Sequence, residues 1–208
     1  MPFYARFWIC SAVLLAAVFS SAQQTVMHAS GKLVVNGTPS KTTTTIFVSD
    51  NVETDTATHA DLTSRGNSLT FAPNSQFVAE QNAFKLEKGG SKVATYTGMT
   101  AHLPDCWSVT PVRPDYMTLY EVVWSGSSAY VYARSEDVKL KGAGREWTLK
   151  EGHTARIRDV KLCKPAIDFW PQPNLPTMLE LAGTTAFVTT IPLWANENSK
   201  NDLSPDHP

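Results

Sequence analysis

Short alternating segments dominate the chain from Lys32 to Val160. Glycine, asparagine, aspartate, serine or proline interrupts this region every few residues, and apolar and polar residues alternate between the interruptions. Strand side chains point to opposite faces in turn, so this alternation is typical of half-buried strands. No window long enough for a helix has an apolar period of 3.6 residues. The sequence therefore predicts an all-β fold of short antiparallel strands, arranged as a β-sandwich or a β-solenoid-like domain.

Individual segments show the pattern clearly. Leu69 and Phe71 should share one face of a strand, and Phe84 and Leu86 should share one face of another. Gly89-Gly90 supplies a turn before the next strand, and the sequence from Trp124 to Ser128 predicts a hairpin turn. Residues 84–89 and 147–152 share the order aromatic, polar, Leu, charged, charged, Gly, as paired sheets or stacked β-coils would require.

The N-terminal residues have the features of a secretory signal peptide. One basic residue, Arg6, precedes an apolar run from Phe7 to Phe19, and Ser20 and Ala22 provide the small residues of a cleavage site. The run is short for a membrane span, although an uncleaved anchor is the alternative. We therefore expect residues 1–22 to be a signal peptide and the protein to be exported, to the periplasm or beyond.

Cleavage after Ala22 would remove Cys10 and leave Cys106 and Cys163. An exported protein meets an oxidising environment, so these two residues are a disulfide candidate. Closing so long a loop would stabilise the fold by about 4 kcal/mol in the chain-entropy description. Two separate buried thiols are the alternative, because sequence does not show whether the two Cα atoms approach each other.

The C-terminal part differs from the strand-rich region. A proline-rich stretch from Trp170 to Pro176 cannot be helix or central strand. The run Leu181–Ala195 then carries no charge, and a polar tail follows. As a helix this run would be about 22 Å long, short of the ~30 Å hydrocarbon core. A membrane span, an element docked on the domain and a segment that binds a partner or cofactor all remain open for Leu181–Ala195.

Composition excludes several functions. The 18 Lys and Arg residues balance 19 Asp and Glu residues with no basic cluster, which argues against nucleic-acid binding. His59 and Asp61 could share a strand face, but a metal site needs at least three converging ligands, so no metal or cofactor is expected. Surface carboxylates could serve a glycoside hydrolase, which makes a secreted hydrolase the alternative function; the candidates are Glu80, Glu87, Glu121 and Glu136.

Four aromatic residues on two consecutive predicted strands are candidate binding residues. Tyr120 and Trp124 share one strand face, as do Tyr130 and Tyr132 on the next strand, so cross-strand aromatic pairs could form. An exposed aromatic face would suit a glycan or a partner protein, because aromatic side chains supply large contact areas. The alternative is that both faces are core.

The order of short motifs resembles the FecR family of exported bacterial β-domains. An Asp-x-Val-x-Thr opening lies at residues 50–54, an Ala-x-Leu strand at 60–62, and a strand ending in Leu-x-x-Gly at 86–89. Between them, the stretch Gly66-Asn-Ser-Leu-Thr-Phe71 stands where the family has a Ser-x-Leu strand. Tyr120-Glu-Val122 and the stretch from Trp147 to Gly152 resemble a second part of the same pattern, so the resemblance covers about residues 45–158. Ser49 stands where the family often has glycine.

The resemblance implies an exported, non-catalytic domain that recognises an envelope protein or a glycan. The sensor members carry a cytoplasmic sigma-regulating segment, whereas a handful of residues precede the apolar run here, so we do not expect that segment. We expect a signal peptide at residues 1–22, a FecR-like domain at 23–165, and a proline-rich linker, apolar segment and polar tail at 166–208. Leu181–Ala195 would provide any contact with the membrane.

Overall fold

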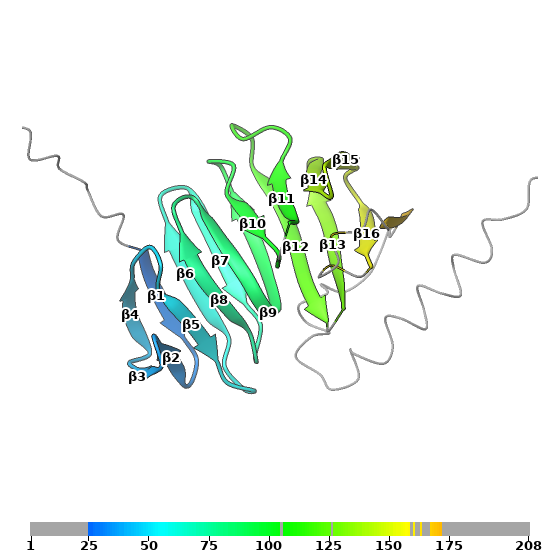
Figure 1. Ribbon diagram of the computed structural model, residues 1–208. Helices are drawn as coiled ribbons and strands as arrows, with labels where there is room; N and C mark the ends of the chain where they lie inside the picture. Colours follow the sequence, from blue (N-terminus) through cyan, green and yellow to red (C-terminus); the bar gives the residue numbers. More distant parts are fainter. Residues whose placement is uncertain are drawn as a thin grey trace, which may run out of the picture.

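The computed structural model describes residues 25–104, 106–125, 127–158, 160, 163 and 167–171. Most of these residues lie in strands, and the others lie in the connections between strands (Figure 1). The expected all-β class is therefore confirmed. The strands are β1 (Thr25–Ala29), β2 (Leu33–Val35), β3 (Thr38–Ser40), β4 (Thr43–Ile46), β5 (Asn51–Thr54), β6 (Ala60–Ser64), β7 (Asn67–Phe71), β8 (Gln76–Glu80), β9 (Ala83–Thr95), β10 (Thr100–His102), β11 (Ser108–Pro111), β12 (Thr118–Ser125), β13 (Ser128–Ser135), β14 (Val138–Gly142), β15 (Arg145–Leu149), β16 (His153–Ile157) and β17 (Ile167–Pro171).

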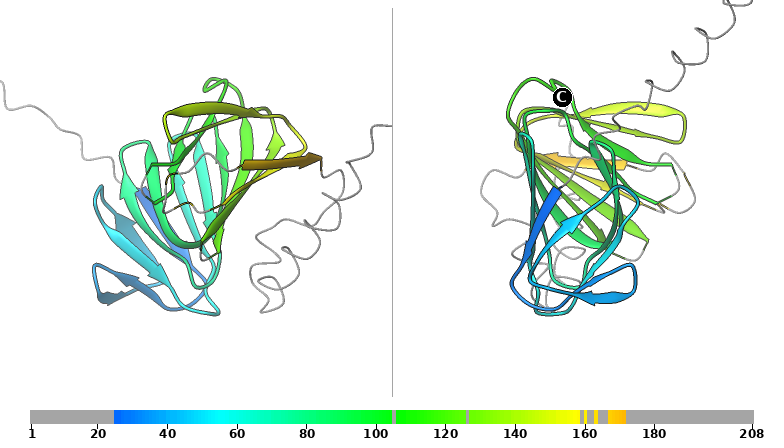
Figure 2. Two further views of the ribbon diagram at one scale, coloured as in Figure 1. Left: turned by 45° about the vertical axis from the view of Figure 1, so that its right-hand side comes forward. Right: turned by 90° about the vertical axis from the view of Figure 1, so that its left-hand side faces the viewer.

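The strands form a sandwich of two facing sheets (Figure 2). Sheet A has the order β4-β1-β6-β7-β9-β12-β13-β16-β17. Sheet B has the order β3-β2-β5-β8-β9-β10-β11-β14-β15. Every pairing is antiparallel except that of β9 with β10, which is parallel, a detail that the alternation of residues did not predict.

β9 belongs to both sheets. Its first half pairs with β8 in sheet B, and its second half pairs with β7 and β12 in sheet A. The chain bends between the halves at Gly89, whose φ of +85° is unfavourable for any residue with a Cβ. The predicted turn at Gly89-Gly90 is therefore wrong: β9 continues through both residues, and the positive φ of Gly89 bends the strand without ending it.

Ser75 fixes the bend of β9 from the neighbouring connection. The Gly90 N–H donates to Ser75 Oγ over 3.0 Å, and this hydroxyl donates to the Gly90 carbonyl over 3.2 Å. The Ser75 N–H donates to Thr54 Oγ1 over 2.9 Å. All of these groups are buried, so their hydrogen bonds compensate for the loss of water.

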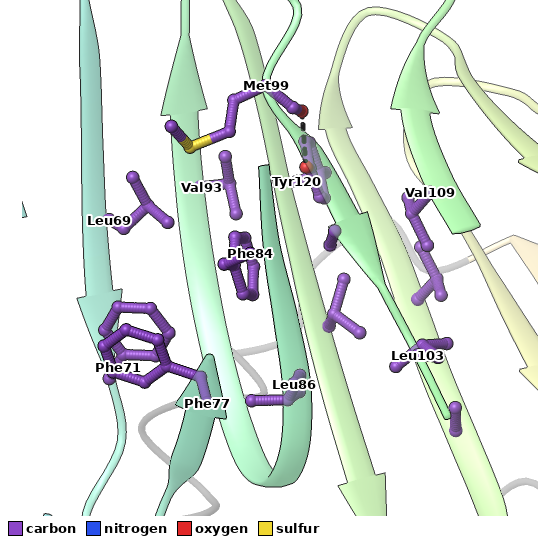
Figure 3. Packing of buried hydrophobic residues seen from close by; sticks show 14 of the residues in the cluster. Leu69, Phe71, Phe77, Phe84, Leu86, Val93, Met99, Leu103, Val109 and Tyr120 are labelled. Atoms are coloured by element: carbon purple, nitrogen blue, oxygen red, sulfur yellow. Dashed lines mark hydrogen bonds between the residues drawn. The ribbon is translucent and has the colours of Figure 1, made fainter. Parts of the chain in front are cut away.

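The core lies between the two sheets and is rich in aromatic residues (Figure 3). Phe71 from sheet A stacks on Phe77 from sheet B with ring centroids 3.6 Å apart, and Phe84 meets Phe71 edge-on at 5.4 Å. Leu69 and Leu86 are buried beside them. The expected faces of these two strand segments are therefore confirmed.

Other turns and edges also follow the sequence. Ser125 pairs with Ser128 at the end of the β12–β13 hairpin, as expected for the stretch from Trp124 to Ser128. Gly89 and Gly152 both adopt positive φ where the chain passes from sheet B to sheet A, which explains the similarity of residues 84–89 and 147–152. Pro171 ends β17, which pairs only with β16 in the described part of the chain and so avoids a central position.

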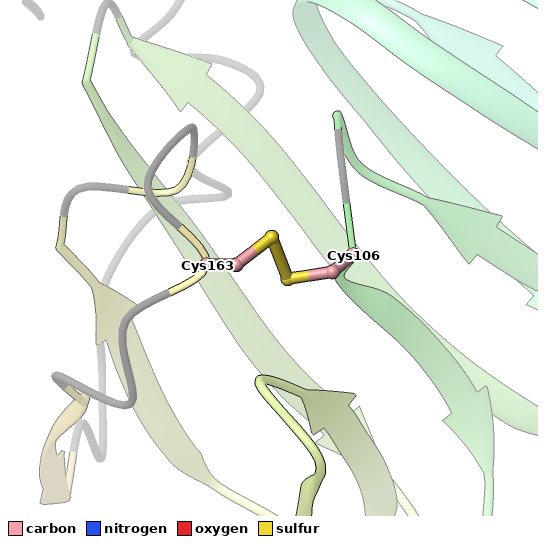
Figure 4. Close-up of a disulfide and its surroundings, with 2 residues drawn as sticks. All are labelled: Cys106 and Cys163. Carbon is pink, nitrogen blue, oxygen red and sulfur yellow. A yellow bond between two sulfur atoms is a disulfide. The ribbon is translucent and has the colours of Figure 1, made fainter.

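A disulfide between Cys106 and Cys163 ties the two sheets at one edge (Figure 4). Cys106 lies in the β10–β11 connection of sheet B, and Cys163 lies between β16 and β17 of sheet A. Their Cα atoms are 5.9 Å apart, within the range for a disulfide. Nearby, Trp107 packs on Trp147 with ring centroids 5.5 Å apart.

Two expectations fall outside the described residues. These are the signal peptide at residues 1–22 and the apolar segment Leu181–Ala195. Within the described ranges, no helix has the length and apolar character needed to cross a membrane.

Replacing Gly89 with alanine should destabilise the fold by about 2–4 kcal/mol, from a left-handed backbone and overpacking together. A Cβ at this position would lie 2.6 Å from Ser75 Cα. Gly144→Ala is the matched control, because Gly144 also has positive φ (+71°) but no atom lies within 4 Å of an added Cβ. Urea unfolding measures the free energy of unfolding of both variants. An equal loss of stability in the two would contradict the prediction, because the contact with Ser75 would then have no effect.

Replacing both Cys106 and Cys163 with serine should lower the free energy of unfolding by about 2–4 kcal/mol. The disulfide restricts the unfolded chain across a sequence separation of 57 residues. The measurement is urea unfolding of the double variant beside the oxidised and the reduced native protein. The reduced native protein should match the variant, and identical stability of its oxidised and reduced forms would contradict the prediction.

Candidate functional site: an apolar loop rim

Exposed apolar side chains gather at one edge of the sandwich. Among the described residues, eight large hydrophobic side chains are exposed, and six of them lie in connections between strands. Tyr96, 58 % exposed, follows β9, while Tyr116, 49 % exposed, precedes β12. The six residues are Phe47, Val48, Tyr96, Val112, Tyr116 and Met117.

The connections that carry these residues adjoin one another. Thr95 pairs with both Asn67 and Thr118, which places the β6–β7, β9–β10 and β11–β12 connections together (Figure 1). Ser49 N–H donates to the Ala79 carbonyl, which brings the β4–β5 loop to the end of β8. We call this surface the loop rim; it comprises residues 47–50, 65–66, 81–82, 96–99, 112–117 and 136–137.

Side-chain hydrogen bonds hold the middle of the loop rim in place. Asn67 Oδ1 accepts from Thr95 Oγ1 over 2.5 Å and from Thr97 Oγ1 over 2.9 Å. Asn82 Nδ2 donates to the Thr97 carbonyl over 3.1 Å. The exposed ring of Tyr96 therefore projects from a backbone that is fixed on both sides, which lowers the entropy lost when a partner binds.

Charged groups order the β11–β12 loop. The Arg113 guanidinium forms an ion pair with Glu136, and its central carbon lies 4.1 Å from the centroid of the Tyr116 ring. The Val112 N–H donates to the Asp137 carbonyl over 3.1 Å. Tyr116 is thus held against Arg113, and the pair presents an aromatic and a cationic group side by side.

Asp137 anchors the next turn of the loop rim. Lys150 Nζ lies 2.7 Å from Asp137 Oδ2, and the Glu151 N–H donates to Oδ1 over 3.0 Å. The hydrogen bond from Lys150, followed by that from Glu151, holds the pKa of Asp137 below its ordinary value of 3.8. The ionised form of Asp137 is therefore favoured by the fold.

A small cavity lies beneath the β4–β5 loop. Phe47 and Val48 line it together with core residues that include Leu69 and Phe77, and its volume is about 30 Å³. Pockets for small organic molecules are usually about 300–1,000 Å³. This cavity is too small for such a ligand, so contact at the loop rim would take place on its surface.

A wider but open groove runs along the outside of sheet B. It has a volume of about 580 Å³, and Glu80, Lys85, His102 and Lys141 contribute to its lining. His102 Nδ1 lies 2.6 Å from Glu80 Oε2, and Lys85 Nζ lies 3.2 Å from Glu87 Oε1. Glu80, His102 and Lys85 of the groove thus already have side-chain partners.

The structure corrects the interpretation of Tyr120 and Trp124 as surface binding residues. Tyr120 is fully buried, and its hydroxyl donates to the Met99 carbonyl over 2.8 Å (Figure 3). Burial raises the pKa of Tyr120 above its ordinary value of 10.0. Trp124 is partly buried and packs against the same core. The inner face of β12 is therefore core, which was the alternative.

Tyr130 and Tyr132 point the opposite way. Val131 and Ala133, which alternate with them on β13, belong to the core between the sheets, so the two tyrosines lie on the outer face of sheet A. Arg156 lies over the Tyr130 ring at 5.7 Å, and Arg134 over the Tyr132 ring at 5.4 Å. Burial raises the pKa of Tyr130, although Arg156 opposes this effect. The four predicted aromatic residues therefore do not form one surface.

Each of the four candidate glutamates pairs with a different basic residue. Glu80 pairs with His102, Glu87 with Lys85 and Glu136 with Arg113. Glu121 is fully buried, with Arg134 Nε 2.7 Å from its Oε1. Each carboxylate thus contacts a basic group. In the part of the chain that the structure describes, no three His, Cys, Asp or Glu side chains are placed to hold a metal ion.

No protein-family model matches the chain, and no curated protein matches it. The chain is similar to two crystal structures from Parabacteroides distasonis ATCC 8503, both described as a "putative anti-sigma factor", with sequence identities of 8 % and 9 %. Each similarity has a TM-score of 0.47 and covers 59 % of both chains.

Reasoning from sequence missed the loop rim. Tyr96 and Met117 lie directly beside β9 and β12, so the local sequence pattern does not distinguish them from strand residues. The missed signal is the turn chemistry beside them, since Gly98 has positive φ and packs against Pro114. Apolar residues next to such turns are candidates for an exposed site.

Asp137→Asn should lower the free energy of unfolding at pH 7 by about 0.5–1 kcal/mol, given the partial exposure of the ion pair with Lys150. The folded-state pKa of Asp137 is lowered, so its contribution is present above 3.8 and is lost as the pH falls further. Urea unfolding at pH 7 and pH 3 should show a smaller difference from the native protein at pH 3. Asp115→Asn in the exposed β11–β12 loop is the control, and a difference that does not shrink would contradict the prediction.

Proposed function

We propose that this chain is an exported, non-catalytic recognition domain that binds a partner protein of the bacterial envelope through its loop rim. The observation that carries the proposal is the gathering of six of eight exposed large hydrophobic residues at one edge. Exposed apolar residues grouped in adjoining loops are typical of a protein-binding surface. Export rests on the signal-like residues 1–22, and the envelope on the resemblance of residues 45–158 to the FecR family.

The chemistry of the loop rim favours a protein as the partner. Aromatic, methionine and arginine residues are enriched at protein interfaces, and tyrosine and arginine are frequent hot-spot residues. Tyr96, Arg113, Tyr116 and Met117 provide this combination on adjoining loops. Their hydrogen bonds and ion pairs hold the loops before binding, which favours tight contact. Glycan binding is an outcome that the experiment below distinguishes.

Replacing Tyr96 and Tyr116 together with alanine should weaken partner binding by about tenfold or more, because exposed tyrosines that become buried in an interface are common hot spots. The full chain is expressed with its own N-terminal residues, and its partner is captured from envelope extract, identified by mass spectrometry and titrated. N-terminal sequencing of the same material should begin at Gln23 if residues 1–22 are removed.

Val26→Ala and Phe169→Ala are the matched controls, because both side chains are exposed and apolar but lie outside the loop rim. They should leave the affinity unchanged. A partner that binds all variants equally, or capture of polysaccharide alone, would contradict the proposal. An N-terminal Met1 on protein recovered from cells would contradict export by cleavage.

A further inference from the structure

The outer face of sheet A changes character across the sheet. On β6 and β7 the outward side chains are exposed and polar, for example Asp61, Thr63 and Ser68. On β12, β13 and β16 a group of outward side chains is buried instead. We call this buried part the β12–β13–β16 face; it comprises Glu121, Val123, Tyr130, Tyr132 and Thr154.

The strand register shows that this face is not part of the core between the sheets. Val122, Val131 and Ala155 alternate with the buried outward residues and belong to the core cluster. Val123 and Tyr130 are each only 3 % exposed, and Glu121 and Thr154 are fully buried, yet sheet B packs on the opposite side. Something other than the two sheets therefore covers the β12–β13–β16 face.

Buried polar atoms around the face indicate that its cover is in contact with it. Thr154 Oγ1, Arg156 Nε and Trp170 Nε1 are buried without a hydrogen-bond partner among the described residues. Thr154 pairs with Trp170 across β16 and β17, so these atoms lie close to the place where the described chain ends. Water would reach such atoms on an uncovered sheet surface.

We propose that the chain covers this face with its own C-terminal segment, residues 172–195. β17 ends at Pro171 and is separated from β13 by β16 alone. Adjacent strands lie about 4.8 Å apart, so the distance from β17 to β13 is about 10 Å. Residues 172–180 can extend about 30 Å, which is enough for Leu181–Ala195 to reach β13 and β12.

The other parts of the chain are less suitable occupants. The N-terminal residues precede β1, which β6, β7 and β9 separate from β12 in sheet A. The β16–β17 connection is directed toward sheet B by the disulfide from Cys163 to Cys106. The run Leu181–Ala195 matches the face chemically, because it carries no charge and its threonines can hydrogen-bond to the buried polar atoms.

A photo-crosslinker placed on the face tests the proposal in the full chain. Tyr130→p-benzoylphenylalanine should form, on irradiation, an intramolecular crosslink to the fragment containing residues 172–195, identified by mass spectrometry. Thr63→p-benzoylphenylalanine is the matched control, because Thr63 lies on the exposed outer face of the same sheet. It should give at least about tenfold less of this crosslink.

Three outcomes would overturn the proposal: a crosslink at the mass of a dimer, a crosslink to lipid in membrane preparations, and no crosslink at all. Retention of the full chain in the membrane pellet after an alkaline wash would overturn it as well, because Leu181–Ala195 would then be in the bilayer.

A second variant separates loss of docking from loss of folding. Val123→Asp places a charge on the face and should speed limited proteolysis within residues 172–195 about tenfold, while the near-UV circular dichroism of the domain stays unchanged. Thr63→Asp should leave the proteolysis rate as it is. Equal rates in both variants would count against the docked segment.

Discussion

The described fold depends on the bend of β9 at Gly89. Strand pairing joins β1 to β8 with β10 to β17 through this strand alone, in both sheets of the described chain. The bend requires a left-handed backbone beside Ser75, which only glycine accommodates without strain. The hydrogen bonds between Ser75 and Gly90 then satisfy the polar groups that the bend buries. Local glycine chemistry thus determines how the two halves of the sandwich meet.

Much of this architecture could be predicted from the sequence, because alternation is a local property. Leu69 and Phe71 lie on the buried face of β7 as their spacing predicts, and glycines mark the crossings between sheets. The parallel pairing of β9 with β10 could not be predicted, because it depends on where the chain crosses between the sheets. Alternation also gives two faces for each strand without showing which one faces the other sheet.

The candidate site shows this limit most clearly. Tyr120 and Tyr130 have the same local pattern, yet the first lies in the core and the second lies on the outer face of sheet A. Their burial depends on what packs on each side of the sheet, which is a property of the whole chain. Tyr96 lies directly after β9, and Tyr116 lies shortly before β12. Both are exposed because they are in connections, where no second sheet covers them. A short strand segment does not contain this information.

The loop rim and the β12–β13–β16 face share two strands. β12 begins at Thr118, directly after Met117 of the loop rim, and carries Glu121 and Val123 on its outer face. β13 carries Tyr132 and ends at Ser135, directly before Glu136, which pairs with Arg113. The surface proposed to bind a partner therefore adjoins the same two strands whose outer face the C-terminal segment is proposed to cover.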